Sequence, residues 1–178
     1  MLPPRVRRET GHEFVTRVLK EQREGNGVAF AIRRRGSSDV MGQIRLMNWS
    51  PSELRAEVGY WIGRSYWGHG YATEAVRLVC GFGFRRMRLH RIDATVIESN
   101  SGSTRVLEKA GFRVEGILRD AARLGRGWAD EVVYGLLRSE WDRERSSKSS
   151  RAPPVDGPPS ETASPAGRGQ SIRVHRRE

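Results

Sequence analysis

The chain has 178 residues and a formal net charge of +11 at pH 7. Its length suits one domain with a full hydrophobic core, or a somewhat smaller domain with a tail. No apolar run approaches the ~20 residues of a membrane-spanning helix, and the basic amino terminus lacks the apolar stretch of a secretory signal. A single cysteine, Cys80, excludes an internal disulfide framework and suits a reducing compartment. We therefore expect a soluble, cytoplasmic protein.

Most of the positive charge is arginine and falls within residues 1–145. Such a composition commonly gives a solvated surface, and the alternatives are a surface that meets an anionic ligand or the ribosome. We favour the first interpretation, so neither a nucleic acid nor a membrane is an expected partner.

The first part of the chain predicts one helix and three strands. Thr10 to Glu13 has the Thr-x-x-Glu form of a capping box, and the apolar spacing that follows predicts a helix over 11–24. Alternating apolar residues then predict strands over 28–33, 40–47 and 55–62. Alternation along the third strand puts Glu57, Gly59 and Trp61 on one face and Ala56, Val58, Tyr60 and Ile62 on the other.

A glycine-rich turn and a long amphipathic helix come next. Gly63, Gly68 and Gly70 precede a helix that we expect over 71–87, where apolar and small residues recur at helical spacing. The first turn of a helix leaves backbone N–H groups without internal partners and carries the positive end of the peptide dipoles. Gly68 and Gly70 have no side chain, so a phosphate can approach successive amides. The pattern predicts a pyrophosphate cradle, with an ordinary strand-to-helix connection as the alternative.

The remaining residues complete an α+β domain. We expect a strand over 91–97, a short helix from Asn100 to Ala110, and strands over 112–118 and 131–137. From Ser146 onward Pro, Gly, Ser and Arg dominate, which predicts a disordered tail over 146–178. The chain therefore divides into a basic segment over 1–10, a domain over 11–145 and that tail. The domain has one central strand–helix–strand crossover.

Five motifs together resemble the GNAT superfamily of N-acetyltransferases, and within it the branch of the ribosomal-protein N-terminal acetyltransferases. They are Ala56–Ile62, Tyr66–Ala75, Asn100–Ser103, Glu108–Phe112 and Glu115–Gly116, within a resemblance that covers about residues 11–142. The resemblance implies a mostly antiparallel mixed sheet with splayed central strands and packed helices. Family members usually begin with a further strand and helix, so we expect either an upstream start or the loss of that edge strand and of part of the acceptor-side wall.

The resemblance implies acetyl-CoA as the donor and a primary amine as the acceptor. Its phosphate-binding motif falls on the turn, with Trp67 at a first position that holds Arg or Gln elsewhere in the family. The positions implied to bind the donor in this turn are Trp67, Gly68, His69, Gly70, Tyr71, Ala72 and Thr73. Those implied elsewhere are Tyr60, Trp61, Ile62, Asn100, Ser103, Arg105 and Lys109, with Arg64 as a further cation near the phosphates. By the same resemblance Asn100 orients the cofactor arm, and Ser103 is the candidate acid that returns a proton to the departing thiolate.

Acetyl transfer to an amine needs a base, because an ordinary amine is mostly protonated at pH 7. Glu57 is the candidate base, and the alternative is a surface glutamate paired with an arginine. Asp130 and Glu131 are the second choices. Ser103 has the alternative of a helix-capping hydroxyl, and Cys80 is expected in the core. His12 and His90 show no metal-ligand spacing with any Cys or Asp, so we expect no metal.

Two other functions compete with acetyl transfer. A nicotinamide-binding oxidoreductase is disfavoured because Thr73 stands where the third glycine belongs and Asp93 lies in mid-strand. A non-catalytic, amino-terminally truncated GNAT-like domain that binds CoA, RNA or the ribosome stays open. Within the enzyme hypothesis, the acceptor is a protein N-terminus, a small amine or an aminoglycoside-like antibiotic, and the protein is a monomer or a homodimer.

Overall fold

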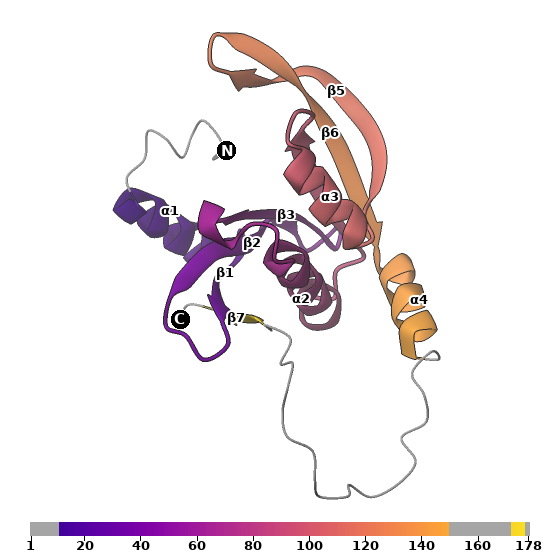
Figure 1. Ribbon diagram of the computed structural model, residues 1–178. Coiled ribbons are helices and arrows are strands. Elements are labelled where there is room, and N and C mark those ends of the chain that lie inside the picture. The colour runs from indigo at the N-terminus through magenta and orange to yellow at the C-terminus, as the bar shows by residue number, and fades with distance from the viewer. Residues whose placement is uncertain (1–10, 150–171, 177–178) are drawn as a thin grey trace, which may run out of the picture.

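The computed structural model describes residues 11–149 and 172–176 and confirms an α+β fold (Figure 1). Its helices and strands, in chain order, are α1 (Gly11–Arg23), β1 (Gly27–Arg34), β2 (Val40–Ser50), β3 (Arg55–Ile62), η1 (Arg64–Tyr66), α2 (Tyr71–Arg86), β4 (Arg91–Ile97), α3 (Ser101–Lys109), β5 (Arg113–Leu124), β6 (Gly127–Leu137), α4 (Arg138–Ser149) and β7 (Ile172–Arg176).

The strands form one sheet in the order β5-β6-β4-β3-β2-β1-β7. Neighbouring strands are antiparallel except β3 and β4, which are parallel and joined by the crossover through α2. The β3–β4 pairing runs from Arg55↔Arg91 to Glu57↔Asp93 and then stops, although β3 continues to Ile62 and β4 to Ile97. The expected splay of the central strands is therefore confirmed, and Glu57 lies at its fork.

The main core lies between α2 and one face of the sheet. The buried stripe of α2 is formed by Tyr71, Ala75, Val76, Val79, Cys80 and Phe84. It packs on alternate strand residues that include Ile44, Leu46, Val58, Ile92 and Leu136. Cys80 is fully buried, as expected, and burial raises the pKa of its thiol. Burying a Val or Phe side chain stabilises the fold by about 1.5–3 kcal/mol, so the buried stripe of α2 holds the crossover on the sheet.

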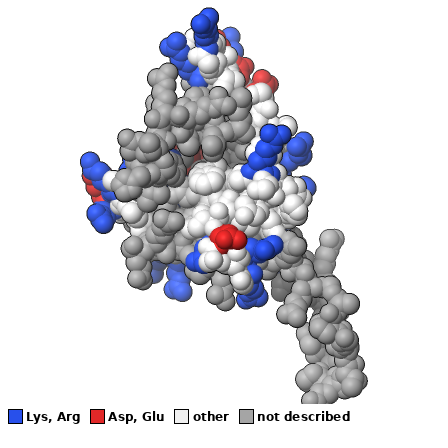
Figure 2. Space-filling view, turned by 60° about the vertical axis from the view of Figure 1, so that its left-hand side comes forward, with Lys and Arg blue, Asp and Glu red and all other residues white. Residues whose placement is uncertain are grey.

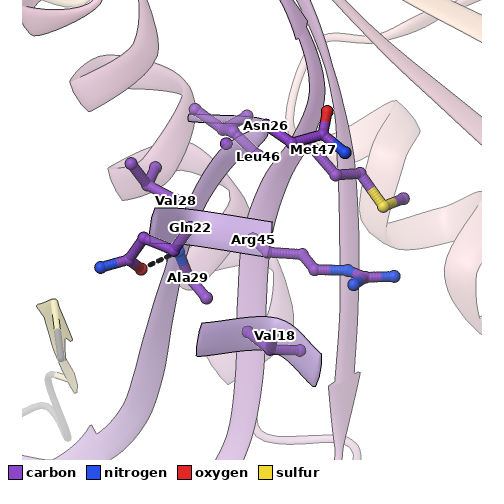
Figure 3. Close-up of a pocket in the computed structure, with 9 residues that line it drawn as sticks. Val18, Gln22, Asn26, Val28, Ala29, Arg45, Leu46 and Met47 are labelled. Atoms are coloured by element: carbon purple, nitrogen blue, oxygen red, sulfur yellow. Dashed lines mark hydrogen bonds between the residues drawn. The ribbon is translucent and has the colours of Figure 1, made fainter. Parts of the chain in front are cut away.

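The opposite face of β1 and β2 is covered in part by α1. Val18 is buried there, and the side-chain oxygen Oε1 of Gln22 accepts a hydrogen bond from the Ala29 N–H at 3.2 Å. A shallow pocket lies beside this contact (Figure 3), lined by residues of α1, β1, β2 and the α1–β1 turn. Arg45 and Met47 point away from the pocket, across the neighbouring strand (Figure 3). None of the lining residues belongs to β3, β4 or α2, so this pocket is distinct from the opening between β3 and β4.

Strands β5 and β6 form a hairpin that is longer than the sequence predicted. The predicted strands ended at Leu118 and began at Glu131, whereas the observed ones extend to Leu124 and from Gly127. The hairpin projects from the body of the domain (Figure 1), so its outer part has no buried face and shows no apolar alternation. Arg side chains gather at its tip at the top of the molecule (Figure 2), where Arg119, Arg123 and Arg126 are exposed.

The carboxy-terminal part differs from the expected disordered tail in two segments. Helix α4 continues to Ser149, past the expected domain boundary at residue 145, and Trp141 anchors it against Phe84 of α2 with ring centroids 5.9 Å apart. Strand β7 pairs with β1, from Phe30↔Arg176 to Arg34↔Ile172. Backbone pairing at a sheet edge needs no apolar pattern, which explains why composition pointed elsewhere. Residues 150–171 of the expected tail and the basic segment 1–10 lie outside the described residues.

Candidate active site

The opening between β3 and β4 is bridged on the helix side of the sheet. The Tyr60 hydroxyl donates a hydrogen bond to the backbone carbonyl of Ser103 at 3.3 Å, which links β3 to α3. Burial raises the pKa of Tyr60 to about 12, so the hydroxyl stays protonated and keeps donating at neutral pH. The two elements that border the opening are therefore held at a fixed separation.

Glu57 is half-buried at the fork of the two strands. Its carboxylate oxygen Oε2 accepts a hydrogen bond from the side-chain amide of Asn48 at 2.9 Å. Burial raises the pKa of Glu57, the Asn48 hydrogen bond opposes this rise, and the charges of Asp93 and Glu131 add to it. The positive charge of Arg45 lowers the pKa of Glu57. The Asn48 side-chain amide is thus a hydrogen-bond partner of Glu57, and the raised pKa makes the carboxylate a better proton acceptor.

Asp93, the strand neighbour of Glu57, is held by arginines. The Arg91 guanidinium donates to Asp93 Oδ1 at 2.5 Å and to Glu115 Oε1 at 2.8 Å, and Arg55 Nε lies 3.6 Å from Asp93 Oδ2. The hydrogen bond from Arg91 lowers the pKa of Glu115. This network crosses β6 at Gly135, where an added Cβ would lie 2.3 Å from Glu115 Oε1. The arginines thus offset part of the negative charge beside Glu57.

The predicted cradle is a turn with two glycines in the left-handed conformation. Gly68 and Gly70 both have φ of 80°, and Gly70 caps the amino terminus of α2 in the left-handed conformation. A Cβ at either glycine would meet nothing within 4 Å, so the turn has open space beside its backbone. The Tyr71 side chain is buried, so it does not fill this space. The amino terminus of a helix favours an anion, so this turn stays the predicted phosphate site.

Asn100 and Ser103 form the amino-terminal turn of α3. Asn100 is the cap, because its Oδ1 accepts a hydrogen bond from the Ser103 N–H at 3.2 Å. The alternative in which the Ser103 hydroxyl caps this helix is therefore wrong. Farther along α3, Arg105 and Lys109 are exposed, and the Lys109 carbonyl accepts a hydrogen bond from Arg77 of α2. This bond fastens α3 to the helix that begins at the cradle.

A comparison with family models shows where this arrangement belongs. Residues 1–113 match the model of the acetyltransferase (GNAT) domain. The chain belongs to the GNAT acetyltransferase family. The match confirms the resemblance that the five sequence motifs carried.

The GNAT relatives include named acetyltransferases. The probable N-acetyltransferase YjcK of Bacillus subtilis (strain 168) is 36% identical over 129 residues, which cover 72% of this chain and 69% of that protein. The putative ribosomal N-acetyltransferase YdaF of the same organism is 33% identical over 67% of this chain and 64% of its own length. The solved structure of Mycobacterium smegmatis RimJ in complex with CoA-disulfide has a TM-score of 0.67 and 28% identity, over 76% of this chain and 66% of that one. The matches span about two thirds of these relatives.

Trp67 has a structural role at the position where the GNAT motif carries Arg or Gln. Its side chain is 53% exposed, and its indole N–H donates to the Ile62 carbonyl at 2.7 Å. This bond ties the phosphate turn to the end of β3. Of the three residues expected to meet the cofactor arm, Ile62 therefore has its carbonyl engaged by the protein itself. His69 stacks on Tyr71 with ring centroids 5.6 Å apart.

The two second-choice carboxylates of this GNAT domain differ in surroundings. Asp130 Oδ1 accepts the Asp120 N–H at 2.9 Å, so this side chain stabilises the β5–β6 hairpin. Glu131 is half-buried and pairs in register with Ile97 at the end of β4. Its charge raises the pKa of Glu57. The structure thus brings Glu131 into the field of Glu57 and places Asp130 in the hairpin.

Sequence reasoning missed Asn48 and Arg91. The sequence predicts a strand that ends before Asn48, at residue 47, and a strand that begins at Arg91. One signal for Asn48 was available, because Asn tolerates the left-handed conformation that strand bulges use. Nothing in the order of residues indicated that Arg91 bridges Asp93 to Glu115.

Two features are absent from residues 11–149 and 172–176. No helix in these ranges combines the length and the apolar character required to cross a membrane. The same ranges contain no group of three or more His, Cys, Asp and Glu side chains arranged to hold a metal ion.

Proposed function

We propose that the protein transfers the acetyl group of acetyl-CoA to a primary amine. The observation that carries the proposal is the half-buried Glu57 carboxylate at the fork of β3 and β4, joined by the same crossover to an open, glycine-built helix terminus. Membership in the GNAT family supports it. In this proposal the fork supplies the base and the helix terminus a place for the diphosphate of the donor.

The donor would be held mainly by backbone groups. Amides around Gly68, Gly70 and Thr73 would bind its diphosphate, because they lie at the positive end of α2. The exposed side chains of Arg64, Arg105 and Lys109 are the proposed counter-charges. The arm of the coenzyme would follow β3 beyond the fork, along Tyr60, Trp61 and Ile62, where β4 no longer pairs with it. Asn100 would contribute through the helix turn that it caps.

A neutral amine loses one proton as the amide forms, and the departing sulfur gains one. An acceptor that arrives as an ammonium ion first releases a further proton to solvent. In the proposed reaction Glu57 accepts the amine proton, directly or through water, as the amine nitrogen bonds to the thioester carbonyl carbon. The carbon–sulfur bond breaks, and the Ser103 hydroxyl is the proposed proton donor to the sulfur. The products are the N-acetylated amine and CoA. General acid–base help of this kind contributes about 10²–10⁴-fold to the rate.

The acceptor class is a protein N-terminus, with a small amine as the alternative. Names among the relatives support the first choice, because YdaF is a putative ribosomal N-acetyltransferase. The negative charges of Asp93 and Glu131 around Glu57 suit any acceptor that arrives as a cation.

The test measures donor binding first and acceptor choice second. Calorimetry with acetyl-CoA should show binding that the Gly70→Ala change weakens. A panel of peptides with free N-termini, a polyamine and an aminoglycoside would then be assayed for CoA release, with Glu57→Gln as the matched inactive variant. Failure to bind acetyl-CoA at millimolar concentration would overturn the proposal, and full activity of the Glu57→Gln variant would overturn the assignment of the base.

A further inference from the structure

We infer that Asn48 is a positioning residue for the Glu57 base. The inference rests on the proposed function, since it assigns a partner to the proposed base. Its starting observation is the 2.9 Å hydrogen bond from the Asn48 side-chain amide to Glu57 Oε2.

The backbone brings Asn48 to Glu57 through a β-bulge. The register of β2 with β3 changes from Met47↔Glu57 to Ser50↔Arg55, so residues 48 and 49 together oppose residue 56. In a regular strand the residue after Met47 would point to the opposite face of the sheet. Asn48 has a φ of 52°, in the left-handed region. The bulge and this φ return its side chain to the face that Glu57 occupies.

The residue type matches this position in two ways. Asn is among the few side-chain-bearing residues that adopt the left-handed conformation readily. Its amide donates to a carboxylate but does not titrate, so it orients Glu57 without competing for the proton. One carboxylate oxygen receives the Asn48 bond, and the proposed reaction needs a single oxygen of Glu57 to accept the amine proton.

The hydrogen bond from Asn48 also lowers the pKa of Glu57, against the groups that raise it. Burial and the carboxylates of Asp93, from β4, and Glu131, from β6, favour the protonated acid. Arg45, from β2, and the Asn48 amide favour the carboxylate. A base works only when it is deprotonated, so Asn48 keeps Glu57 in its active form to lower pH.

The experiment compares two Asn48 variants with a matched control. Asn48→Gly removes the amide and keeps a residue suited to the φ of 52°. Asn48→Asp keeps the shape and replaces the donor by a carboxylate. Arg88→Gly is the control, because Arg88 has a similar φ of 57° and lies beyond the end of α2. Each protein is assayed from pH 5 to 9 with acetyl-CoA and a free-N-terminus peptide, and its Glu carboxyl carbons are titrated by ¹³C NMR.

We expect the acid limb of kcat/KM to move to higher pH in Asn48→Gly and farther in Asn48→Asp. On the acid side of the limb kcat/KM should be about tenfold lower in the glycine variant than in the parent, the loss expected for one hydrogen bond to a charged group. The KM for acetyl-CoA should not change, and the NMR titration of Glu57 should move with the acid limb. Arg88→Gly should leave every readout as in the parent protein.

The positioning role of Asn48 and the proposed acetyl transfer are overturned by different results. An unchanged Glu57 titration in both Asn48 variants would overturn the positioning role, whether or not the protein is active. Absence of turnover with every amine, together with a Glu57 titration that does move, would overturn the proposed function and leave the contact established.

Discussion

At the scale of single residues, the charge that Glu57 needs as a base lowers the stability of the fold. Burial raises its pKa, so the folded state disfavours the charged form that a base requires. A group of this kind contributes stability below its unfolded pKa and loses that contribution as the pH rises through the folded value. At neutral pH the ionised carboxylate therefore destabilises the fold. The Asn48 hydrogen bond and the charge of Arg45 reduce this destabilisation.

Replacing Glu57 by Gln should abolish activity and stabilise the fold at pH 7. The rate should fall about 10²–10⁴-fold because the base is lost. Thermal unfolding should show a higher Tm than the parent at pH 7 and a much smaller difference near pH 4. Glu115→Gln is the control of opposite sign. The pKa of Glu115 is lowered by Arg91, so its stabilising contribution is present at pH 7 and is lost as the pH falls, and its removal should lower the Tm at pH 7. A lower Tm for Glu57→Gln would contradict the argument.

Arg91 should influence catalysis without touching a substrate. Its guanidinium neutralises Asp93, the strand neighbour of Glu57. In Arg91→Gln the uncompensated Asp93 charge should raise the pKa of Glu57 and move the acid limb of kcat/KM to higher pH. Arg113→Gln is the matched control, since Arg113 pairs instead with Glu140 at 3.0 Å. Identical pH profiles for the two variants would refute the link.

At the scale of elements, alanine substitutions in the glycine turn before α2 should test whether this turn binds acetyl-CoA. Gly68→Ala and Gly70→Ala each place a side chain at φ of 80°, which costs about 1–2 kcal/mol. Each should also weaken acetyl-CoA binding, because the added methyl group fills the space beside the amides. Gly125→Ala provides the control, with φ of 66° at the hairpin tip and equally open space. It should lose similar stability in thermal unfolding and keep its affinity for acetyl-CoA in calorimetry. Equal affinity in all three variants would exclude the cradle.

The elements also show which parts of the structure a sequence reveals. The bounds of β3 and β4 were predicted residue for residue, because each strand has one buried face and alternates accordingly. The outer part of β5 and β6 has no buried face, and among residues 138–147 of α4 only Trp141 is buried, so neither segment carries a periodic signal. The candidate base could be predicted because the alternation of apolar residues places Glu57 on one face of a strand. Its partner Asn48 was missed because a bulge changes the face of a side chain without changing the composition.

At the scale of the whole molecule, the sheet consists of two halves around one opening. The strands β5, β6 and β4 form one half, and β3, β2, β1 and β7 the other. The halves are joined in the sheet only by the short parallel pairing that ends at Glu57↔Asp93, and α2 crosses from one to the other. The stability of each half therefore determines how precisely the opening is held.

The outer edge of the second half depends on the end of the chain, because β7 is the partner of β1 there. A chain ending at residue 171 should expose the backbone of β1 as a free edge, which favours pairing between molecules. We expect concentration-dependent self-association in analytical ultracentrifugation. Hydrogen exchange supplies an internal control, since alternate amides of β1 face β7 and β2. Exchange should accelerate at the amides that face β7 and stay slow at those that face β2. Uniform exchange along β1 in both proteins would show that β7 does not protect this edge in solution.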